Sequence, residues 1–354
     1  MPVVDDIDAI IGDAINRGVF PGAVVLVARD GTVRKRAAYG YSALYDRSGR
    51  RCPDPIATTA DTIFDLASLT KVVATTTAVL QLVEAGALAL DAPASTYLDE
   101  FARADKRAIT VRHLLTHTAG LPADRPFHKR FRDPAAIVAA AGRVRMAGAP
   151  GDRVLYSDVG FIALGAIVER VSGLTLDRYV ARRIAAPLGL RHTRYRPPPA
   201  WRPRVAATEC QAGRGVVWGV VHDDKAAAMG GIAGHAGLFS DAADLATFTT
   251  ALLDAERGVS SPLLRPGTVR EMFDAHTGAL SPPRGLGWLC DDPSFMGALA
   301  SPRTVGHTGF TGTSIVLDLE RRLSVILLTN RVHPSREGPA LGPVRSAVAE
   351  AAAL

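Results

Sequence analysis

Segments with the pattern of β-strands stand at both ends of the chain, and this arrangement constrains the fold more than any other feature of the sequence. Near the start, residues 22–29 are apolar and β-branched, an Asp30-Gly31 turn follows, and residues 32–41 alternate in polarity. Near the end, three further segments have strand character, residues 304–306, 314–319 and 323–329. The two groups predict one antiparallel sheet that is assembled from both chain ends.

Helical periodicity dominates the long stretch between these strands. Apolar residues recur every three or four positions in six segments, residues 69–85, 135–145, 158–172, 176–184, 242–254 and 266–273. Two more helices are predicted near the ends, over residues 5–15 and 344–353, and the proline-rich residues 196–203 are predicted to form a loop. The sequence therefore predicts an α/β domain from residues 1–60 and 275–354, an inserted, mainly helical domain from residues 61–274, and a site at their interface.

Composition excludes several classes of protein. The chain has 354 residues, of which 47% are hydrophobic and 21% charged, a balance that predicts a sizeable core and excludes intrinsic disorder. The net charge of +6 could suggest a nucleic-acid partner. However, the basic residues are scattered and aromatic residues are only 6% of the chain, so we expect no nucleic acid to bind.

The cysteines and the chain start bear on location and cofactors. Cys52, Cys210 and Cys290 are far apart and have no metal-binding spacing, which argues against disulfides and a zinc site and fits a reducing compartment. The first residues are acidic rather than basic and apolar, and no run of about 18 apolar residues occurs. We therefore expect a cytoplasmic protein with no membrane span, no metal and no cofactor.

The tetrad Ser68-Leu69-Thr70-Lys71 stands where a loop enters the helix predicted over residues 69–85. Positions i and i+3 share a helix face, so the Ser68 hydroxyl and the Lys71 ammonium can point into the same space. A helix N-terminus also stabilises negative charge, which suits a serine that must become a nucleophile. Lysine is protonated at neutral pH and acts as a base only when desolvated or placed beside another cation.

Two further motifs complete a candidate constellation. Tyr156-Ser157-Asp158 precedes a periodic segment, and a phenol near an ammonium has its anionic form favoured, so Tyr156 could accept and return a proton. His307-Thr308-Gly309 leads out of a predicted strand. A glycine there lets a ligand approach the backbone, whose N–H groups can stabilise an oxyanion.

The order Ser-x-x-Lys, then Tyr-x-Asn, then Lys/His-Thr-Gly resembles the serine β-lactamase and penicillin-binding protein superfamily. The chain is most similar to class C β-lactamase-like serine hydrolases, which include family VIII carboxylesterases. The resemblance runs from about residue 24 to residue 330 and includes residues 64–67, 114–122 and 230–240. It implies a β-lactamase/transpeptidase-like fold, an antiparallel sheet flanked by helices with an inserted helical domain. It also implies that Ser68 is the acylated nucleophile, Lys71 its charge partner and Tyr156 the general base and acid, with Ser68 and Phe310 supplying the oxyanion N–H groups.

Two positions depart from the family pattern. Asp158 stands where asparagine is usual, and a carboxylate accepts but cannot donate a hydrogen bond to a substrate carbonyl. It could instead pair with Lys71 or favour a substrate that carries a donor or a cation. His307 stands where β-lactamases have lysine, and a neutral imidazole does not hold a substrate carboxylate as an ammonium does. Both departures favour ester or amide hydrolysis, or acyl transfer, over β-lactam turnover.

Other histidine-containing segments are interpreted as structural. His113 and His117 have an i, i+4 spacing, but the glutamate of a zinc-protease signature is absent. The glycine-rich residues 230–237 lack a nucleotide-binding pattern and are predicted to line the pocket. Residues 222–225, His-Asp-Asp-Lys, are interpreted as a solvated charged turn, with a position at the border of the cleft as the alternative.

These observations predict a serine hydrolase that forms an acyl-enzyme at Ser68, most simply a carboxylesterase acting on small esters or amides. An acyltransferase would use the same intermediate with an alcohol or amine in place of water. A D,D-peptidase, a D-aminopeptidase or a β-lactamase is a further alternative. The last alternative is a non-catalytic binding protein of the same fold, which the retention of Ser68, Lys71 and Tyr156 disfavours.

Overall fold

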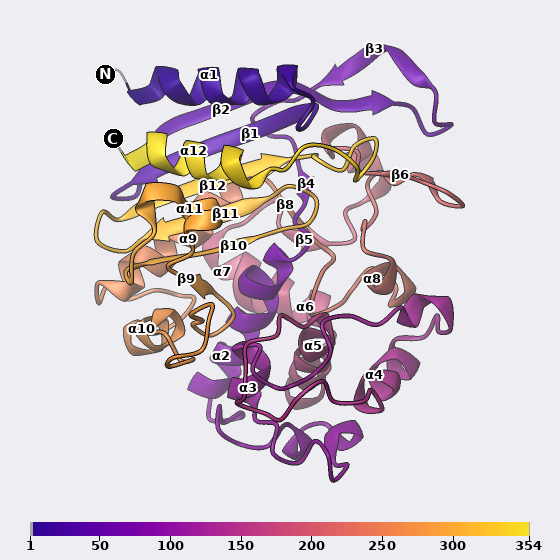
Figure 1. The fold of residues 1–354 in the computed structure, drawn as a ribbon, viewed down its shortest axis with the longest axis vertical. Coiled ribbons are helices and arrows are strands. Elements are labelled where there is room, and N and C mark those ends of the chain that lie inside the picture. Colours follow the sequence, from indigo (N-terminus) through magenta and orange to yellow (C-terminus); the bar gives the residue numbers. More distant parts are fainter. Residues whose placement is uncertain (1–2, 354) are drawn as a thin grey trace.

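The computed structural model describes residues 3–353 and contains a seven-stranded antiparallel sheet drawn from both ends of the chain (Figure 1). Its spatial order is β3-β2-β1-β12-β11-β10-β9. The strands are β1 (Gly22–Arg29), β2 (Thr32–Tyr45), β3 (Arg51–Ala57), β9 (Leu289–Cys290), β10 (Thr304–Thr308), β11 (Ser314–Asp318) and β12 (Leu323–Thr329). The predicted sheet is thus confirmed, and its two sequence-distant halves meet where β1 pairs with β12.

The central strands are apolar on both faces because both faces of the sheet are covered. Along β1, Val25 and Val27 belong to a hydrophobic cluster with α1 (Val3–Asn16) and α12 (Gly342–Ala353). The intervening residues Val24 and Leu26 belong to the larger cluster on the opposite face. This face carries α9 (Ala242–Glu256), which packs against β1 and β12. The alternation of side chains along a strand therefore divides one continuous apolar run between two cores.

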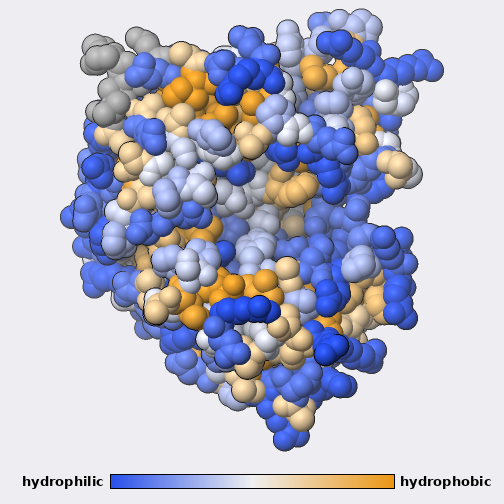
Figure 2. Space-filling model, in the orientation of Figure 1, coloured by the Kyte–Doolittle hydropathy of each residue, from blue (hydrophilic) through white to orange (hydrophobic). Residues whose placement is uncertain are grey.

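Most of the remaining helices form the part of the molecule below the sheet in Figure 1. Figure 2, in the same orientation, shows a mainly hydrophilic face that is indented between the two parts. The helices are α2 (Thr77–Glu84), α3 (Val111–Leu115), α4 (Pro134–Gly142), α5 (Asp158–Ser172), α6 (Leu176–Val180), α7 (Ala186–Leu188), α8 (Asp224–Ala228), α10 (Pro266–Phe273) and α11 (Pro293–Met296). There are also two small sheets. The first has three strands, β4 (Phe64–Asp65), β8 (Leu238–Ser240) and β5 (Arg194–Tyr195), and the second has two, β6 (Cys210–Gln211) and β7 (Gly215–Val216).

The predicted elements are present, and three of the differences from prediction have a plain physical reason or position. Strand β3 was not predicted, because Pro53 and Pro55 interrupt it, and such prolines are tolerated at a sheet edge. The helix predicted over residues 69–85 opens with a π-helical segment, Lys71–Thr76, before α2. The loop predicted over residues 196–203 contains a 3₁₀ helix, Pro199–Arg204. Prolines fit such a short turn because few of its backbone N–H groups have partners within it.

The division into two domains remains a prediction. Helix α9 belongs to the inserted segment by sequence, yet it packs on the sheet. One hydrophobic cluster also includes both Val24 of β1 and Val159 of α5, so apolar packing is continuous across the predicted boundary. No single helix among the described residues is both long and apolar enough to cross a membrane, although α5 with the bent segment 176–188 meets those criteria as a pair.

Candidate active site

Ser68 lies in a tight turn that the protein fixes from several sides. The preceding Ala67 has a φ of +46°, a left-handed conformation that costs a non-glycine residue of the order of 1–3 kcal/mol. The buried Asp65 carboxylate accepts hydrogen bonds from the N–H groups of Ala67 (2.9 Å) and His222 (2.6 Å). The hydroxyls of Thr311 and Thr313 donate to the carbonyls of Asp65 and Leu66, at 2.7 and 3.0 Å. The serine turn is therefore held against the turn between β10 and β11.

Lys71 lies one helical turn beyond the serine and is fully buried. Its ammonium Nζ is 3.0 Å from Ser68 Oγ, 2.8 Å from Asp158 Oδ1 and 3.2 Å from the His235 carbonyl oxygen. These three contacts occupy all three of its donors. Burial disfavours the charged form, but the attraction of Asp158 and the Tyr156 phenol outweighs it and raises the pKa of Lys71. At neutral pH Lys71 is accordingly an ammonium.

Asp158 begins helix α5, and the start of this helix is well defined. The Ser157 side chain caps it by accepting from the Gly160 N–H and donating to the Pro122 carbonyl. Burial would raise the pKa of Asp158, but Lys71, His235 and Lys225 together lower it to about 2. The ion pair between Asp158 and Lys71 that the sequence left open is thus present.

Tyr156 lies among cationic and aromatic groups. The Lys71 ammonium is 4.7 Å and the Arg284 guanidinium carbon 5.5 Å from the centre of the Tyr156 ring. The rings of His117 and His307 lie 4.5 and 6.0 Å from it, centre to centre. These contacts place the Tyr156 ring between the Lys71 ammonium and the Arg284 guanidinium, at the cavity that Ser68 also lines.

His307 is buried and neutral. Its Nδ1 donates to the Thr308 carbonyl at 2.8 Å, which leaves Nε2 as an acceptor with no partner in the described chain. Burial, together with the charges of Arg284 and Lys71, lowers the pKa of His307 well below its usual value. The expectation of a neutral side chain at the position of the family lysine therefore agrees with its surroundings.

Gly309 is required by the fold of the chain itself. A Cβ at this position would lie 2.1 Å from Thr313 Oγ1 and 2.5 Å from the Leu66 carbonyl oxygen. The sequence suggested that this glycine admits a ligand, but the space that a Cβ would fill is taken by Thr313 and the serine turn. The amides of Ser68 and Phe310 donate no hydrogen bond to another described residue, so both are available to an oxyanion.

A cavity of about 450 Å³ brings most of the predicted residues together. It is lined by Ser68, Tyr156, Arg284, Leu289, His307, Thr308, Gly309, Phe310, Arg331, Leu341, Gly342 and Arg345. Lys71 and Asp158 lie behind Ser68 rather than in the lining. Three distant parts of the sequence thus converge on one cavity, as the enzyme hypothesis requires.

Three arginines that were not predicted as site residues, Arg284, Arg331 and Arg345, line this cavity. Arg284 is 4% exposed, and its Nε and Nη1 have no hydrogen-bond partner in the described part of the chain. Burial lowers the pKa of Arg284 to about 10. Arg345 of α12 donates to the carbonyls of Gly309 and Thr313, and burial and Arg331 likewise lower its pKa to about 10. Arginines are scattered along the sequence, so nothing in its pattern distinguished these three.

Phe310 is half exposed at the cavity and is held by a polar cluster. The His222 ring stacks on Phe310 at 5.7 Å, and the Arg336 guanidinium lies 5.5 Å from the ring centre. Both His222 and Arg336 bind the buried Glu209 carboxylate, at 2.9 and 2.5 Å. This cluster orders the residue whose amide is the second expected oxyanion donor.

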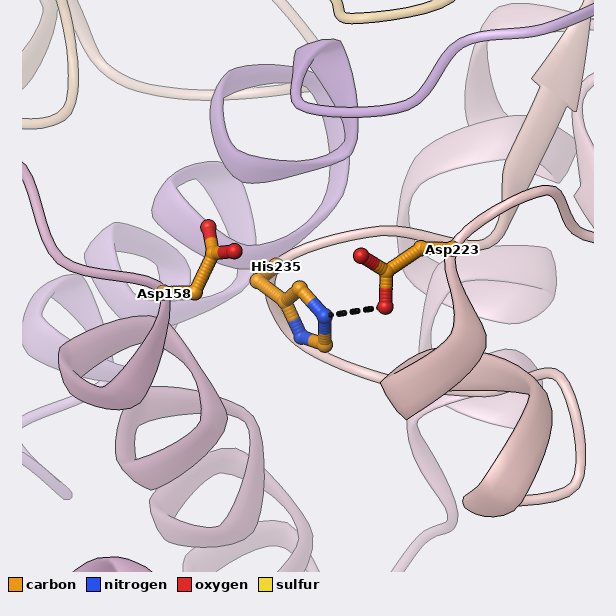
Figure 3. A group of neighbouring side chains, drawn as sticks. All are labelled: Asp158, Asp223 and His235. Carbon is orange, nitrogen blue, oxygen red and sulfur yellow. Dashed lines mark hydrogen bonds and ion pairs between the residues drawn. The ribbon is translucent and has the colours of Figure 1, made fainter. Parts of the chain in front are cut away.

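The interpretation of residues 222–225 as a solvated charged turn is wrong. Lys225 is 7% exposed, because Asp223 caps helix α8 and the helix directs Lys225 towards the start of α5. Figure 3 shows the neighbouring trio Asp158, Asp223 and His235, in which His235 Nε2 lies 2.9 Å from Asp223 Oδ1. The trio has the side-chain types of a metal site, but the Lys225 ammonium faces both of its carboxylates, at 3.2 and 3.3 Å.

Two other sequence interpretations are refined. The prediction that the glycine-rich residues 230–237 line the cavity is wrong. These residues lie behind the cavity, where the His235 carbonyl accepts a hydrogen bond from Lys71. His113 and His117 have local hydrogen-bonding roles. His113 completes a capping box at the start of α3, and His117 Nδ1 accepts from the Ser157 N–H at 3.0 Å.

Comparisons with known proteins agree with this geometry. A family model described as Beta-lactamase matches residues 7–350. A protein of Escherichia coli O157:H7 named "Putative D-alanyl-D-alanine carboxypeptidase" is 34% identical, over 96% of this chain and 85% of its own length. The solved structure of EstCE1, described as a hydrolase with promiscuous acyltransferase activity, has a TM-score of 0.73 and 26% identity over 98% of both chains. The octameric penicillin-binding protein homologue from Pyrococcus abyssi has a TM-score of 0.78 at 24% identity, over 97% of this chain and 76% of that one, and shows the same fold.

Proposed function

Since the chain belongs to the Beta-lactamase family of serine hydrolases, we propose that it hydrolyses small carboxylic esters or amides through an acyl-enzyme on Ser68. The observation that carries this proposal is the 3.0 Å contact between Ser68 Oγ and Lys71 Nζ beside a cavity that Tyr156 also lines. Covalent catalysis divides one difficult acyl transfer into two easier steps.

Acylation begins when Ser68 Oγ attacks the carbonyl carbon of the substrate. As the new C–O bond forms, Tyr156 accepts the hydroxyl proton as the general base. The carbonyl oxygen becomes an oxyanion, which the Ser68 and Phe310 amides stabilise. The bond to the leaving group then breaks, and Tyr156 returns the proton to the leaving oxygen or nitrogen. Lys71 remains an ammonium throughout, because Asp158 holds its charge.

Deacylation repeats these steps with water. Tyr156 removes a proton from water as the water oxygen attacks the acyl carbon, and the same two amides donate hydrogen bonds to the oxyanion. The Ser68–acyl bond breaks, Ser68 regains its proton from Tyr156, and the carboxylic acid leaves. An alcohol or amine that replaces water in this step gives the acyltransferase alternative.

The test combines a covalent probe with a substrate panel. An organophosphonate should add one adduct to the intact mass of the parent protein and none to Ser68→Ala, and a short-chain p-nitrophenyl ester should be hydrolysed only by the parent. An unlabelled parent would favour the non-catalytic binding protein. Adding an alcohol or amine separates hydrolysis from acyl transfer, because only a transferase converts the acyl group into the new ester or amide.

A second candidate is a carboxypeptidase, whose leaving group carries a free carboxylate. Arg284 favours it, since a buried guanidinium with unpartnered donors in the lining of the cavity suits a carboxylate. The relatives named for D-alanyl-D-alanine carboxypeptidase are consistent with this candidate. His307 is neutral and does not hold a substrate carboxylate, but the Arg284 guanidinium in the same cavity can do so. Carboxylate-bearing substrates are therefore compatible with a neutral His307.

The two candidates make different predictions for paired substrates. A carboxypeptidase should cleave an N-acyl-D-alanyl-D-alanine much faster than the same dipeptide with a C-terminal amide. An esterase should hydrolyse p-nitrophenyl esters and leave both dipeptides intact. A chromogenic cephalosporin and a D-amino-acid anilide test the β-lactamase and D-aminopeptidase alternatives in the same assay.

A further inference from the structure

Lys225 is a buried cation that the proposed acylation steps do not use. Its ammonium contacts three carboxylates, Asp124 at 2.9 Å, Asp158 at 3.2 Å and Asp223 at 3.3 Å. Burial disfavours its charge, but these carboxylates outweigh burial and raise its pKa above the usual lysine value. Lys225 is therefore a permanent positive charge near the catalytic lysine, contributed by a different helix.

Asp158 links the two lysines. Its Oδ1 contacts Lys71 at 2.8 Å, and its Oδ2 contacts Lys225 at 3.2 Å, so each carboxylate oxygen faces a different ammonium. In Figure 3 the Asp158 side chain projects from the start of α5, with the His235 loop and Asp223 at the start of α8 beside it. The carboxylate is thus fixed by two cations rather than by one.

The charges in this cluster depend on each other. A buried charge that loses its partner destabilises its surroundings strongly, whereas removal of both members of a pair is tolerated far better. With a neutral side chain at position 158, the Lys71 and Lys225 ammoniums would share a low-dielectric site without the carboxylate between them. With a neutral side chain at position 225, Asp158 would keep only one of its two cationic contacts and could turn away from Ser68.

We propose that Lys225 is a positioning residue for the acylation of Ser68. Through Asp158, it holds the Lys71 ammonium at its position beside Ser68 Oγ. It also accounts for an aspartate where the family usually has asparagine, because the second lysine requires a carboxylate between the two cations. This inference rests on the proposed acyl-enzyme at Ser68.

The test is a double-mutant cycle on the rate of phosphonate labelling, followed by intact mass, and on kcat and KM for a p-nitrophenyl ester. We expect Lys225→Met to lower the labelling rate and kcat by about 10- to 100-fold with KM changed less than threefold. Asp158→Asn should lower both rates at least as much. If the two substitutions acted independently, the rate losses of the single variants would multiply in the double variant. We expect the double variant to react at least tenfold faster than that product. The reason is that it removes the Asp158 and Lys225 charges together, and the asparagine oxygen still accepts a hydrogen bond from Lys71.

Lys106→Met is the matched control. Lys106 is also fully buried and contacts one carboxylate, Asp105, and one carbonyl, Val144, but it touches no residue of the site. We expect it to lower the melting temperature and to leave the labelling rate unchanged. Melting temperatures of all variants show which of them are folded under assay conditions.

The outcomes separate the two proposals. A parent protein that is not labelled overturns the proposed function, and this inference with it. A labelled parent overturns only the inference if a folded Lys225→Met reacts at the parental rate. The inference also fails if the effects of Lys225→Met and Asp158→Asn are additive, because Lys225 would then not act through Asp158.

Discussion

The two walls of the candidate active site differ in whether their positive charges are paired with carboxylates. The helix-side wall is the cluster of Lys71, Asp158 and Lys225, which lies behind Ser68 and outside the cavity lining. It pairs each ammonium with at least one carboxylate at 3.3 Å or less. The strand-side wall, Arg284, His307 and Arg345, faces no acidic side chain among the described residues that line the cavity. Arg284 and Arg345 each retain an unpartnered buried nitrogen, and His307 is neutral.

This difference separates two tasks. Compensated charges cost little to keep in one arrangement, so the helix-side wall can hold Ser68 and its proton-transfer partners in fixed geometry. Uncompensated buried donors cost free energy until an acceptor arrives, so the strand-side wall is suited to binding an anionic group. We therefore assign the first wall to the proposed acylation of Ser68 and the second to the proposed binding of substrate.

The largest expected effect is on the acylation rate, which tests the role of the helix-side wall. Tyr156→Phe removes the group that we expect to carry the proton and should lower the acylation rate by about 10²- to 10⁴-fold. Stopped-flow or intact-mass kinetics measures this directly. Tyr179→Phe is the control, because Tyr179 is a buried core residue whose hydroxyl makes only a 3.5 Å contact with the Ala78 carbonyl. A loss smaller than tenfold in Tyr156→Phe would transfer the role of base to Lys71.

The next effect is on kcat/KM for charged substrates, which tests whether the strand-side wall binds an anionic group. Arg284→Leu should lower kcat/KM for a substrate with a carboxylate beside the scissile bond by about 10- to 100-fold, the range of hydrogen bonds to charged groups. Hydrolysis of an uncharged ester should change little. Arg196→Leu serves as control, since Arg196 pairs with Asp177 outside the cavity. Equal losses on charged and uncharged substrates would show that Arg284 only supports the fold.

A smaller effect concerns the oxyanion donor on the strand side. Glu209→Gln weakens the contacts that hold His222 and Arg336 around Phe310. We expect kcat to fall about three- to tenfold, less than the loss of a whole donor, because the Phe310 amide is displaced rather than removed. The measurement is kcat on a neutral ester, with KM followed separately. A change in KM alone would mean that the cluster shapes the binding surface and does not align the amide.

The remaining effect is on stability rather than on rate. Burial lowers the pKa of both His117 and His307 well below 6.5, so below that pH the unfolded chain binds protons that the folded chain does not. Unfolding free energy should therefore decrease as pH falls from 6.5, by at most about 1.4 kcal/mol per pH unit for each group. Urea unfolding at pH 7.5 and 5.5 measures the slope. His307→Gln should flatten it, and an unchanged slope would contradict a buried neutral His307.

Some parts of the fold and site follow from local sequence. The boundaries of β1, β12, α5 and α10 agree with prediction, because apolar periodicity and flanking turn or cap residues define them. The motifs at Ser68, Tyr156 and His307 were also found, since each combines rare residue types in fixed spacing. Strand β3 and the burial of Lys225 were missed, because edge pairing and long-range ion pairs leave no periodic signal.

The sequence by itself predicted the candidate nucleophilic and acid–base residues and determined most of the segments that form strands and helices, because these depend on residue type and near neighbours. Only the tertiary structure decided which cations are paired. Asp124, Asp158 and Asp223 reach Lys225 from separate parts of the chain, whereas Arg284 forms no ion pair with a carboxylate of the described residues. Electrostatic free energy depends on distance and burial in space, and neither can be read from separation along the chain.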